Sequence, residues 1–294
     1  MRGHGGNSTA TQSAQRQLRS PRTSHVKKVT AFVGTARKKH THYAVQKFLA
    51  SLESQGDVEC EIVALTDHKL EMCRGCKNCF RRGEEFCPLK DDRDLLIGKM
   101  MTSDGIVFAT PNYSYQVSAT MKAFLDRLGF VFHRPRFFGK TFTSIVAQGI
   151  YGGAKIVKYL DFVGMGLGCN VVRGSCTTAL DPMNERERGG IDRVAVEHSR
   201  RFHSGLSQPA YPVPTLLKLF AFRAARTSMR VMLDESSRDY TYYRDKGWFE
   251  SSYFYPTRLN VLKTNAGKLI DYISLRNARK QSAACKASDP DSGT

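Results

Sequence analysis

Four cysteines lie close together in the segment EMCRGCKNCFRRGEEFCPLKDD, where their thiols could bind a metal. The first three are spaced at intervals of three residues, and the fourth follows eight residues later, directly before a proline. Four thiolates on one loop suit an iron–sulfur cluster or a tetrahedral zinc ion, although zinc modules more often use two separated pairs. Free or redox-active thiols are the third possibility. The residues alone leave all three open for Cys73, Cys76, Cys79 and Cys87.

The remaining cysteines are scattered along the chain, and no secretory signal peptide is recognisable ahead of them. We therefore expect no extracellular disulfide framework. No run of about 18 apolar residues occurs, and the longest apolar stretches have the length of strands. These features predict a soluble, cytoplasmic protein that does not associate with a membrane.

The net charge of +18 is concentrated near the start of the chain. Residues 1–52 contain ten Lys or Arg and no Asp or Glu, and residues 1–25 have almost no large apolar side chains. We expect residues 1–25 to form a disordered basic tail because they cannot pack a core; an organelle presequence is the alternative. A nucleic-acid partner is not favoured, since no aromatic interleaving, helix-turn-helix or zinc-finger spacing accompanies the charge.

Beyond residue 25 the apolar pattern predicts strands alternating with helices. Several of the strand segments are almost continuously apolar, which is typical of a parallel sheet buried on both faces. The predicted helices between the strands have apolar residues near helical spacing. The strands are expected at 26–34, 58–65, 104–111, 141–149 and 169–175, and the helices at 41–55, 91–103, 118–129 and 154–168.

The loop at 34–44, which follows the first predicted strand, is suited to a phosphate group. In a doubly wound sheet, ligands bind beyond the carboxyl ends of the strands where the strand order reverses. Gly34 permits a tight turn, Thr35 and Thr41 supply hydroxyls, Arg37 supplies a charge, and a helix begins immediately afterwards. Backbone N–H groups and the helix dipole would hold a dianion there. The alternative is a solvated basic turn.

The loops after the third and fourth strands are suited to a flat ring. Pro111 and Asn112 turn the chain, and the glycines of residues 147–155 let backbone N–H groups approach a ligand. A wall for the ring would come from Tyr113, Tyr115, Gln116 and Val117. Phosphate in one loop and a planar ring in the others describe a bound mononucleotide; otherwise the tyrosines are ordinary loop aromatics.

These landmarks resemble the flavodoxin-like NAD(P)H-dependent FMN reductases, and in particular their iron–sulfur flavoprotein branch. The resemblance runs from about residue 26 to residue 174 through GTARKKHT, the four-cysteine segment, SDGIVFATPNYSYQVSATMKAFLDR and AQGIYGG, in that order. It implies FMN with its phosphate at Thr35, Arg37 and Thr41. The isoalloxazine would then lie against residues 111–117 and against Gln148, Gly149, Tyr151, Gly152 and Gly153. Ala36 stands where the family usually has proline.

The resemblance also implies roles for the four thiols and for the electron donor. In iron–sulfur flavoproteins such a compact motif holds a [4Fe–4S] cluster, and the ligand role carries over to Cys73, Cys76, Cys79 and Cys87. A reduced nicotinamide, NADH or NADPH, or a ferredoxin would reduce the flavin, which would pass electrons to a small molecule or protein. The competing class is a non-enzymatic redox-sensing or nucleic-acid-associated protein with a zinc-binding loop.

The last third of the chain differs in character from the rest. Helices are expected at 191–206, 215–233 and 259–280, and residues 236–256 are dense in aromatics. The fold is therefore expected to be α/β, a flavodoxin-like doubly wound five-stranded parallel sheet over 26–205, followed by a helical C-terminal extension over 206–294. The extension should pack on the sheet domain or on a second subunit of a homodimer or homotetramer, because its aromatics would otherwise be exposed.

Two further patterns are interpreted as structural. GMGLG at 164–168 echoes a dinucleotide fingerprint, but it falls at the end of a predicted helix instead of after a strand. His133 lies in a predicted loop with no evident partner, so a catalytic role near the flavin is the minor alternative.

Overall fold

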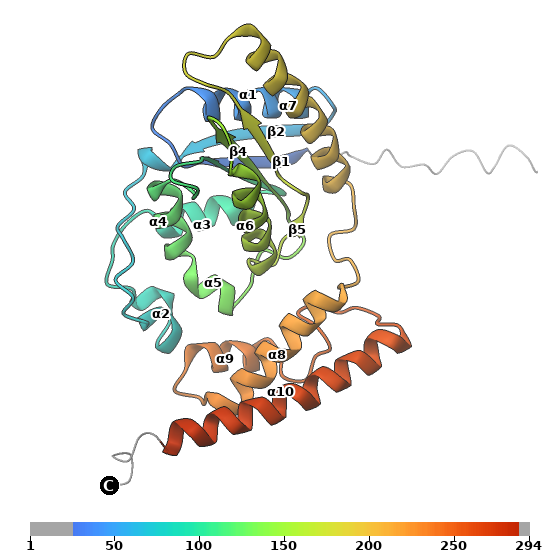
Figure 1. Cartoon of the computed structure of the whole chain (residues 1–294). Coiled ribbons are helices and arrows are strands. Elements are labelled where there is room, and N and C mark those ends of the chain that lie inside the picture. Colours follow the sequence, from blue (N-terminus) through green and yellow to red (C-terminus); the bar gives the residue numbers. More distant parts are fainter. Residues whose placement is uncertain (1–25, 288–294) are drawn as a thin grey trace, which may run out of the picture.

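A parallel sheet forms the centre of the larger part of the molecule (Figure 1). The computed structural model describes residues 26–287, so the tail predicted at 1–25 lies outside the described residues. The strand order is β2-β1-β3-β4-β5, with β6 also paired to β4, and every pairing is parallel. The strands are β1 Lys27–Val33, β2 Val58–Ala64, β3 Gly105–Pro111, β4 Thr141–Gln148, β5 Asn170–Val171 and β6 Ser175–Thr178.

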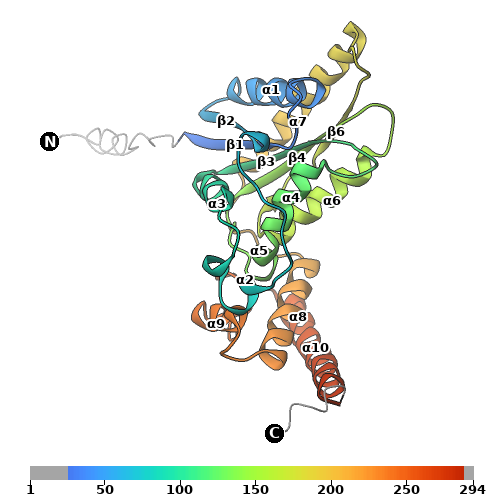
Figure 2. The same ribbon diagram turned by 90° about the vertical axis from the view of Figure 1, so that its left-hand side faces the viewer.

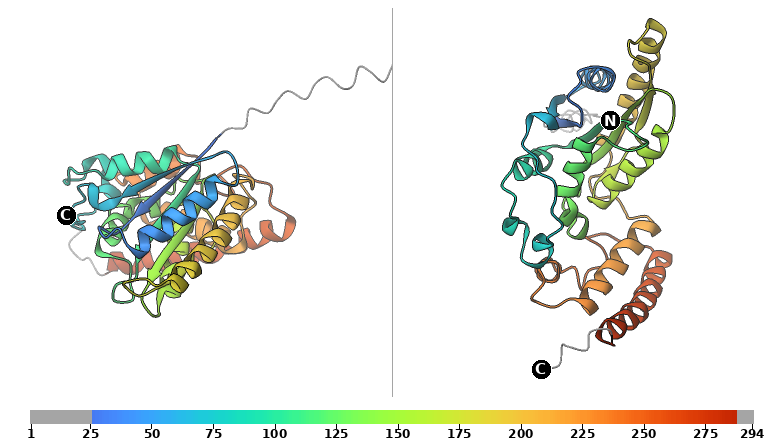
Figure 3. Two further views of the ribbon diagram at one scale, coloured as in Figure 1. Left: turned by 90° about the horizontal axis from the view of Figure 1, so that it is seen from above. Right: turned by 60° about the vertical axis from the view of Figure 1, so that its left-hand side comes forward.

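The sheet is buried on both faces, as the apolar strands predict. All of β3 is buried, and β4 is buried except at its last residue. One face packs against α1 His40–Glu53 and α7 Glu185–Leu206. The other face is covered by α3 Arg93–Thr102, α4 Ala119–Arg127, α5 Gly129–His133 and α6 Gly153–Gly166 (Figure 3). The doubly wound flavodoxin-like prediction is confirmed.

The element boundaries differ from the prediction in places where local chemistry decides them. The expected strand at 169–175 divides into β5 and β6, because the three residues 172–174 stand opposite only two residues of β4, 143–144, and interrupt the pairing. The helix expected at 118–129 ends at Arg127, and α5 continues to His133. A capping box between Asn184 and Glu187 starts α7 before the predicted residue 191.

The helical extension has a small aromatic core of its own. It contains α8 Leu216–Met232, α9 Arg238–Asp245 and α10 Val261–Ala287. Its buried residues include Phe222, Tyr243 and Trp248, and Phe138 from the sheet domain packs against them. Figure 2 shows α9 beside α2 Asn78–Arg81, the short helix of the four-cysteine segment, and these two elements are in contact. The aromatics of residues 236–256 are thus buried or partly buried within one chain.

None of the helices within residues 26–287 is long and apolar enough to cross a membrane. The GMGLG motif lies where α6 ends, at Gly166, which agrees with its interpretation as a helix terminus. Gly168 adopts a φ of 101°, a conformation that favours glycine.

We expect His198 on α7 to make the stability of the sheet depend on pH. It is completely buried, and its two ring nitrogens are within hydrogen-bonding distance of Thr143 and Ser175, at 2.7 and 2.8 Å. Burial lowers its pKa from 6.5 to about 3. A base whose pKa is depressed by folding favours the folded state above its unfolded pKa, and this contribution is lost as the pH falls from 6.5 towards 3.

We expect the free energy of unfolding to fall by about 1.4 kcal/mol per pH unit from this group within that window. Other groups titrate there too, so the measurement compares urea unfolding of the wild type and His198→Gln at pH 6.5 and pH 4.5. The variant, which cannot be protonated at this position, should lose less stability between the two pH values. Equal losses in the two proteins would show that His198 does not carry this dependence.

Candidate functional site

A cavity of about 500 Å³ opens at the carboxyl edge of β1, β3 and β4, where the strand order reverses. It is lined by the loop after β1, the loop after β3, the end of β4 and a segment after β6. Lining residues include Thr35, Arg37, Lys38, Lys39, His40, Thr41, Pro111, Asn112, Tyr113, Gln148, Gly149, Asp181 and Arg188. This is the position that a doubly wound sheet assigns to its ligand.

The end of this cavity beside α1 is cationic. Arg37 Nη2 lies 2.6 Å and Lys39 Nζ 2.5 Å from Oδ2 of Asp181. The hydrogen bond from Lys39 and the charge of Arg37 hold the pKa of Asp181 below its ordinary value. No side chain caps α1 at Lys39, so the N–H groups of its first turn are available to an anion.

The opposite end is built from tight backbone turns. Tyr113 and Gln116 exchange backbone hydrogen bonds of 3.1 and 2.9 Å. Asn112 Nδ2 donates to the carbonyl of Tyr151 at 2.9 Å, while its Oδ1 is buried and has no hydrogen-bond partner within the described residues. The cavity therefore combines an anion site with the polar side chain of Asn112 among its lining residues.

The predicted flavin residues divide into two groups in the structure. Those that line the cavity are Thr35, Arg37, Thr41, Pro111, Asn112, Tyr113, Gln148 and Gly149. The others lie behind or beside it and do not line it: Gly34, Tyr115, Gln116, Val117, Tyr151, Gly152 and Gly153. Gly34 is needed for packing, because a Cβ there would lie 2.7 Å from the Cβ of Met121.

Two of the residues outside the cavity interact with each other instead. The hydroxyl groups of Tyr115 and Tyr151 are 2.7 Å apart, and both side chains are exposed. Gly153 donates its N–H to Gln148 Oε1 at 2.7 Å, which orients a side chain that does line the cavity.

The segment 179–183 and Arg188 line the cavity and were not singled out from the sequence. Asp181 is the most consequential of them because it pairs with two of the three cations of the first loop, Arg37 and Lys39. The segment 179–183 was missed because one strand assigned to 169–175 leaves out most of β6, so the loop that follows β6 is not placed at the edge of the sheet. With β6 recognised, that loop falls at the same carboxyl edge as the others.

The four predicted metal ligands line a second cavity, of about 230 Å³. Cys73, Cys76, Cys79 and Cys87 all border it, together with Arg74, Arg93 and Arg127. The loop wraps around it with positive φ at Gly75 and Lys77, at 65° and 60°. Within the described residues, no three His, Cys, Asp or Glu side chains stand close enough to hold a metal ion. The thiols share one cavity and would have to converge to bind a cluster.

A buried arginine controls the charge of one of these thiols. Arg127 Nη1 donates to the sulfur of Cys87 at 3.1 Å, and its Nη2 donates to Asp91 at 2.7 Å. Partial burial raises the pKa of Cys87, but the hydrogen bond and charge of Arg127 outweigh it and hold the pKa below its ordinary value. Burial raises the pKa of Cys79. The cationic surroundings suit an anionic tetrathiolate group.

His133, expected to lack a partner, has one in the structure. Its Nδ1 lies 2.7 Å from Oδ2 of Asp239, a buried carboxylate on α9 that also pairs with Arg134. Asp239 is 106 residues away in the sequence, which is why no local pattern could indicate it. His133 borders neither of the two cavities described so far.

A parallel sheet in the order β2-β1-β3-β4-β5 with helices on both faces defines the flavodoxin-like class. The sequence model of the NADPH-dependent FMN reductase family matches residues 27–180, and the chain belongs to this family. The chain is similar in fold to a crystal structure titled RosB with bound 8-demethyl-8-formylriboflavin-5'-phosphate. That match has a TM-score of 0.52 and 16% identity, covering 80% of this chain and 92% of the other.

Curated relatives point to the iron–sulfur flavoprotein branch. The chain is 39% identical over 105 residues to an iron–sulfur flavoprotein of Archaeoglobus fulgidus, covering 36% of this chain and 45% of the relative. It is 36% identical over 101 residues to an iron–sulfur flavoprotein of Methanocaldococcus jannaschii, covering 34% and 51% respectively. These matches span about half the length of each relative.

Proposed function

We propose that the protein is an FMN-dependent oxidoreductase that carries electrons from a reduced nicotinamide or a ferredoxin to an acceptor. The observation that carries this proposal is the cavity at the carboxyl edge of the sheet. It has Arg37, Lys39 and the start of α1 on one side, and the loop after β3 with Asn112 and Tyr113 on the other. FMN has one phosphate and one polar ring system, and the two ends of the cavity suit them in that order.

The chain's own residues would bind and orient the cofactor. The phosphate is suited by Arg37, Lys39 and the hydroxyls of Thr35 and Thr41. When the phosphate binds, Arg37 and Lys39 would pair with it instead of with Asp181. Pro111, Tyr113 and Gly149 would border the ring. Bound FMN supplies hydride acceptance and one-electron transfer, so no protein nucleophile is required.

We infer further that Cys73, Cys76, Cys79 and Cys87 hold a [4Fe–4S] cluster. Their common cavity, the arginines that border it and the acidified thiol of Cys87 support this ligand set. Zinc and free thiols are the alternatives that metal analysis would separate. A homodimer or homotetramer is the assembly that we expect. The nucleic-acid reading is not favoured, because the family match lies in the flavin-binding part of the chain.

The proposed function is tested by flavin binding and reduction. Under anaerobic conditions, the purified protein should show a flavin spectrum that NADPH, NADH or reduced ferredoxin bleaches. Arg37→Ala should weaken FMN binding about 10- to 100-fold, because it removes a charge-assisted hydrogen bond to the phosphate. Riboflavin, which has no phosphate, should bind both proteins with nearly equal affinity.

The matched control is Arg200→Ala. Arg200 is an exposed arginine on α7 that does not line the flavin cavity. This variant should bind FMN as the wild type does. Unchanged FMN affinity in folded Arg37→Ala would remove Arg37 from the phosphate site, and the absence of FMN binding by the wild type would overturn the proposed function itself.

A further inference from the structure

A third cavity, of about 760 Å³, lies between the four-cysteine segment and the helical extension. One wall comes from Lys77, Phe80 and Arg81, on and beside α2, and the other comes from α8 and the start of α9. It shares no lining residue with the flavin cavity. Cavities of this size typically hold small organic molecules.

The walls of this cavity are suited to an apolar, ring-shaped body. Phe80 contributes a ring, and Met229, Met232 and Leu233 contribute flexible apolar side chains. Methionine sulfur makes favourable contacts with aromatic rings and adapts to irregular shapes. Met232 and Leu233 are exposed to 45% and 37%, which is a large apolar exposure to leave beside a cavity without a ligand.

The charge of the cavity is suited to an anion. Lys77 and Arg81 border it and are both exposed. The only carboxylate among its lining residues is that of Asp239. This group is buried and is already shared between His133 and Arg134, so it cannot neutralise a cation in the cavity. A ligand would therefore meet two positive side chains without a free negative one.

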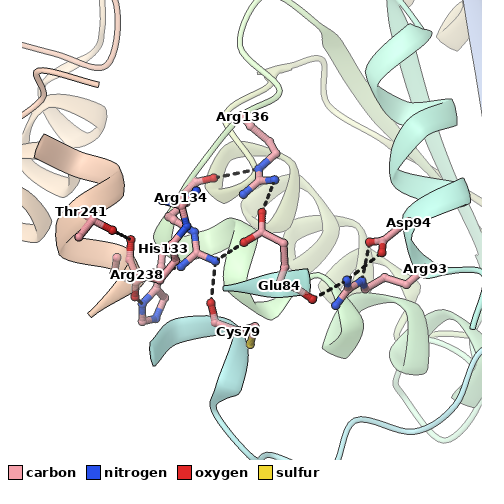
Figure 4. Close-up of polar contacts among 10 residues, drawn as sticks. Cys79, Glu84, Arg93, Asp94, His133, Arg134, Arg136, Arg238 and Thr241 are labelled. Atoms are coloured by element: carbon pink, nitrogen blue, oxygen red, sulfur yellow. Dashed lines mark hydrogen bonds and ion pairs between the residues drawn. The ribbon is translucent and has the colours of Figure 1, made fainter. Parts of the chain in front are cut away.

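His133 is held in a fixed orientation at the cavity. Asp239 fixes its Nδ1 at 2.7 Å, and its ring packs against Phe80 with a centroid distance of 4.4 Å. Asp239 is itself held by Arg134, which is completely buried and also donates to the carbonyl of Cys79 at 2.8 Å and to Glu84 at 2.8 Å (Figure 4). Within the described residues Nε2 makes no hydrogen bond, so it is the ring atom left for a ligand.

We propose that this cavity binds an aromatic organic anion. The ring lies among Phe80, Met229 and Met232, the anionic group lies between Lys77 and Arg81, and His133 forms part of the wall. Lys77 and Phe80 also border the four-cysteine cavity, so the ligand lies directly beside the thiols. The proposal concerns binding and does not depend on the flavin chemistry.

Calorimetric titration of the full chain with its bound FMN tests the proposal. Naphthalene-2-sulfonate is the anionic probe, and 2-naphthol is its uncharged counterpart. The sulfonate should bind to one saturable site per chain and more tightly than 2-naphthol. Lys77→Gln/Arg81→Gln should weaken sulfonate binding about tenfold or more, with little effect on 2-naphthol, because the substitutions remove both positive charges and keep polar side chains at the cavity.

The matched control is Lys158→Gln/Arg200→Gln. This pair removes the same charge from exposed positions on α6 and α7 that border none of the three cavities. It should bind the sulfonate as the wild type does. No saturable sulfonate binding by the wild type, or an equal loss in the two double variants, would overturn the proposal, the latter by showing that net charge alone attracts the probe.

A second variant tests the apolar half of the site. Met229→Gln should weaken the binding of both probes, because it replaces an apolar wall with an amide. Its circular dichroism and flavin content should match those of the wild type, since Met229 is only partly buried and lies outside the flavin cavity. If this variant bound both probes as the wild type does, the probes would bind elsewhere on the molecule and the proposal would be wrong.

Discussion

Replacing Arg134 with methionine should destabilise the contact between the four-cysteine segment and the helical extension by about 3–5 kcal/mol. Arg134 is completely buried and pairs with Asp239 on α9 and with Glu84 of the cysteine segment. Its removal would leave Asp239 without its buried cation, and it would take from Glu84 one of two arginines, since Arg136 still pairs with Glu84 at 2.9 Å. Burial raises the pKa of Glu84, but its hydrogen bonds and the arginines outweigh this and hold the pKa below its ordinary value.

The single tryptophan of the chain allows this loss to be located. Trp248 is 5% exposed in the aromatic core of the extension, so its fluorescence reports unfolding there, whereas flavin release reports the sheet domain. In urea, Arg134→Met should shift the tryptophan transition to lower concentration by more than it shifts flavin release. Equal shifts would show that the two parts unfold as one unit.

Arg201→Met is the control for the loss of an arginine that forms an ion pair. Arg201 on α7 is largely exposed, and it pairs at 3.0 Å with Glu197 one helical turn away. Exposed pairs of this kind contribute up to about 1 kcal/mol, so this variant should unfold almost as the wild type does. If Arg201→Met lost as much free energy of unfolding as Arg134→Met, the burial of Arg134 would not explain the effect of its replacement.

The sheet was predictable from the sequence because its signals are local. Strands such as β3 and β4 are continuous apolar runs, and the parallel order then places the loops after β1 and β3 together. This reasoning brought Thr35, Arg37 and Asn112 to one cavity. The same reasoning could not separate residues that line the cavity from buried neighbours such as Val117. Whether a residue lines the cavity depends on the direction of its side chain within a tight turn.

The contacts that join distant segments were not predictable. The partners Arg134 and Asp239 are 105 residues apart, and the segment containing each is rich in other charges. The pairing of Asp181 with Arg37, 144 residues away, is of the same kind. Both pairings are decided by how separate elements pack. No periodicity or spacing around any of these residues indicates its partner.

Cysteine substitution should have its largest effect on iron content. If the four thiols hold a [4Fe–4S] cluster, Cys87→Ser should reduce iron and acid-labile sulfide in anaerobically purified protein to near zero. FMN should be retained, because the thiol cavity and the flavin cavity share no lining residue. Cys60→Ser is the control: this half-buried thiol on β2 borders neither cavity, so iron, sulfide and FMN should all stay at wild-type levels.

The same measurement separates the two alternatives for the loop. With structural zinc, the wild type would contain zinc without sulfide, and Cys87→Ser would release it and destabilise the loop, since a structural metal contributes folding free energy. With free thiols, the wild type would contain FMN but neither iron, sulfide nor zinc. Either result would refute the cluster and leave the flavin site intact, because the thiol cavity and the flavin cavity have no lining residue in common.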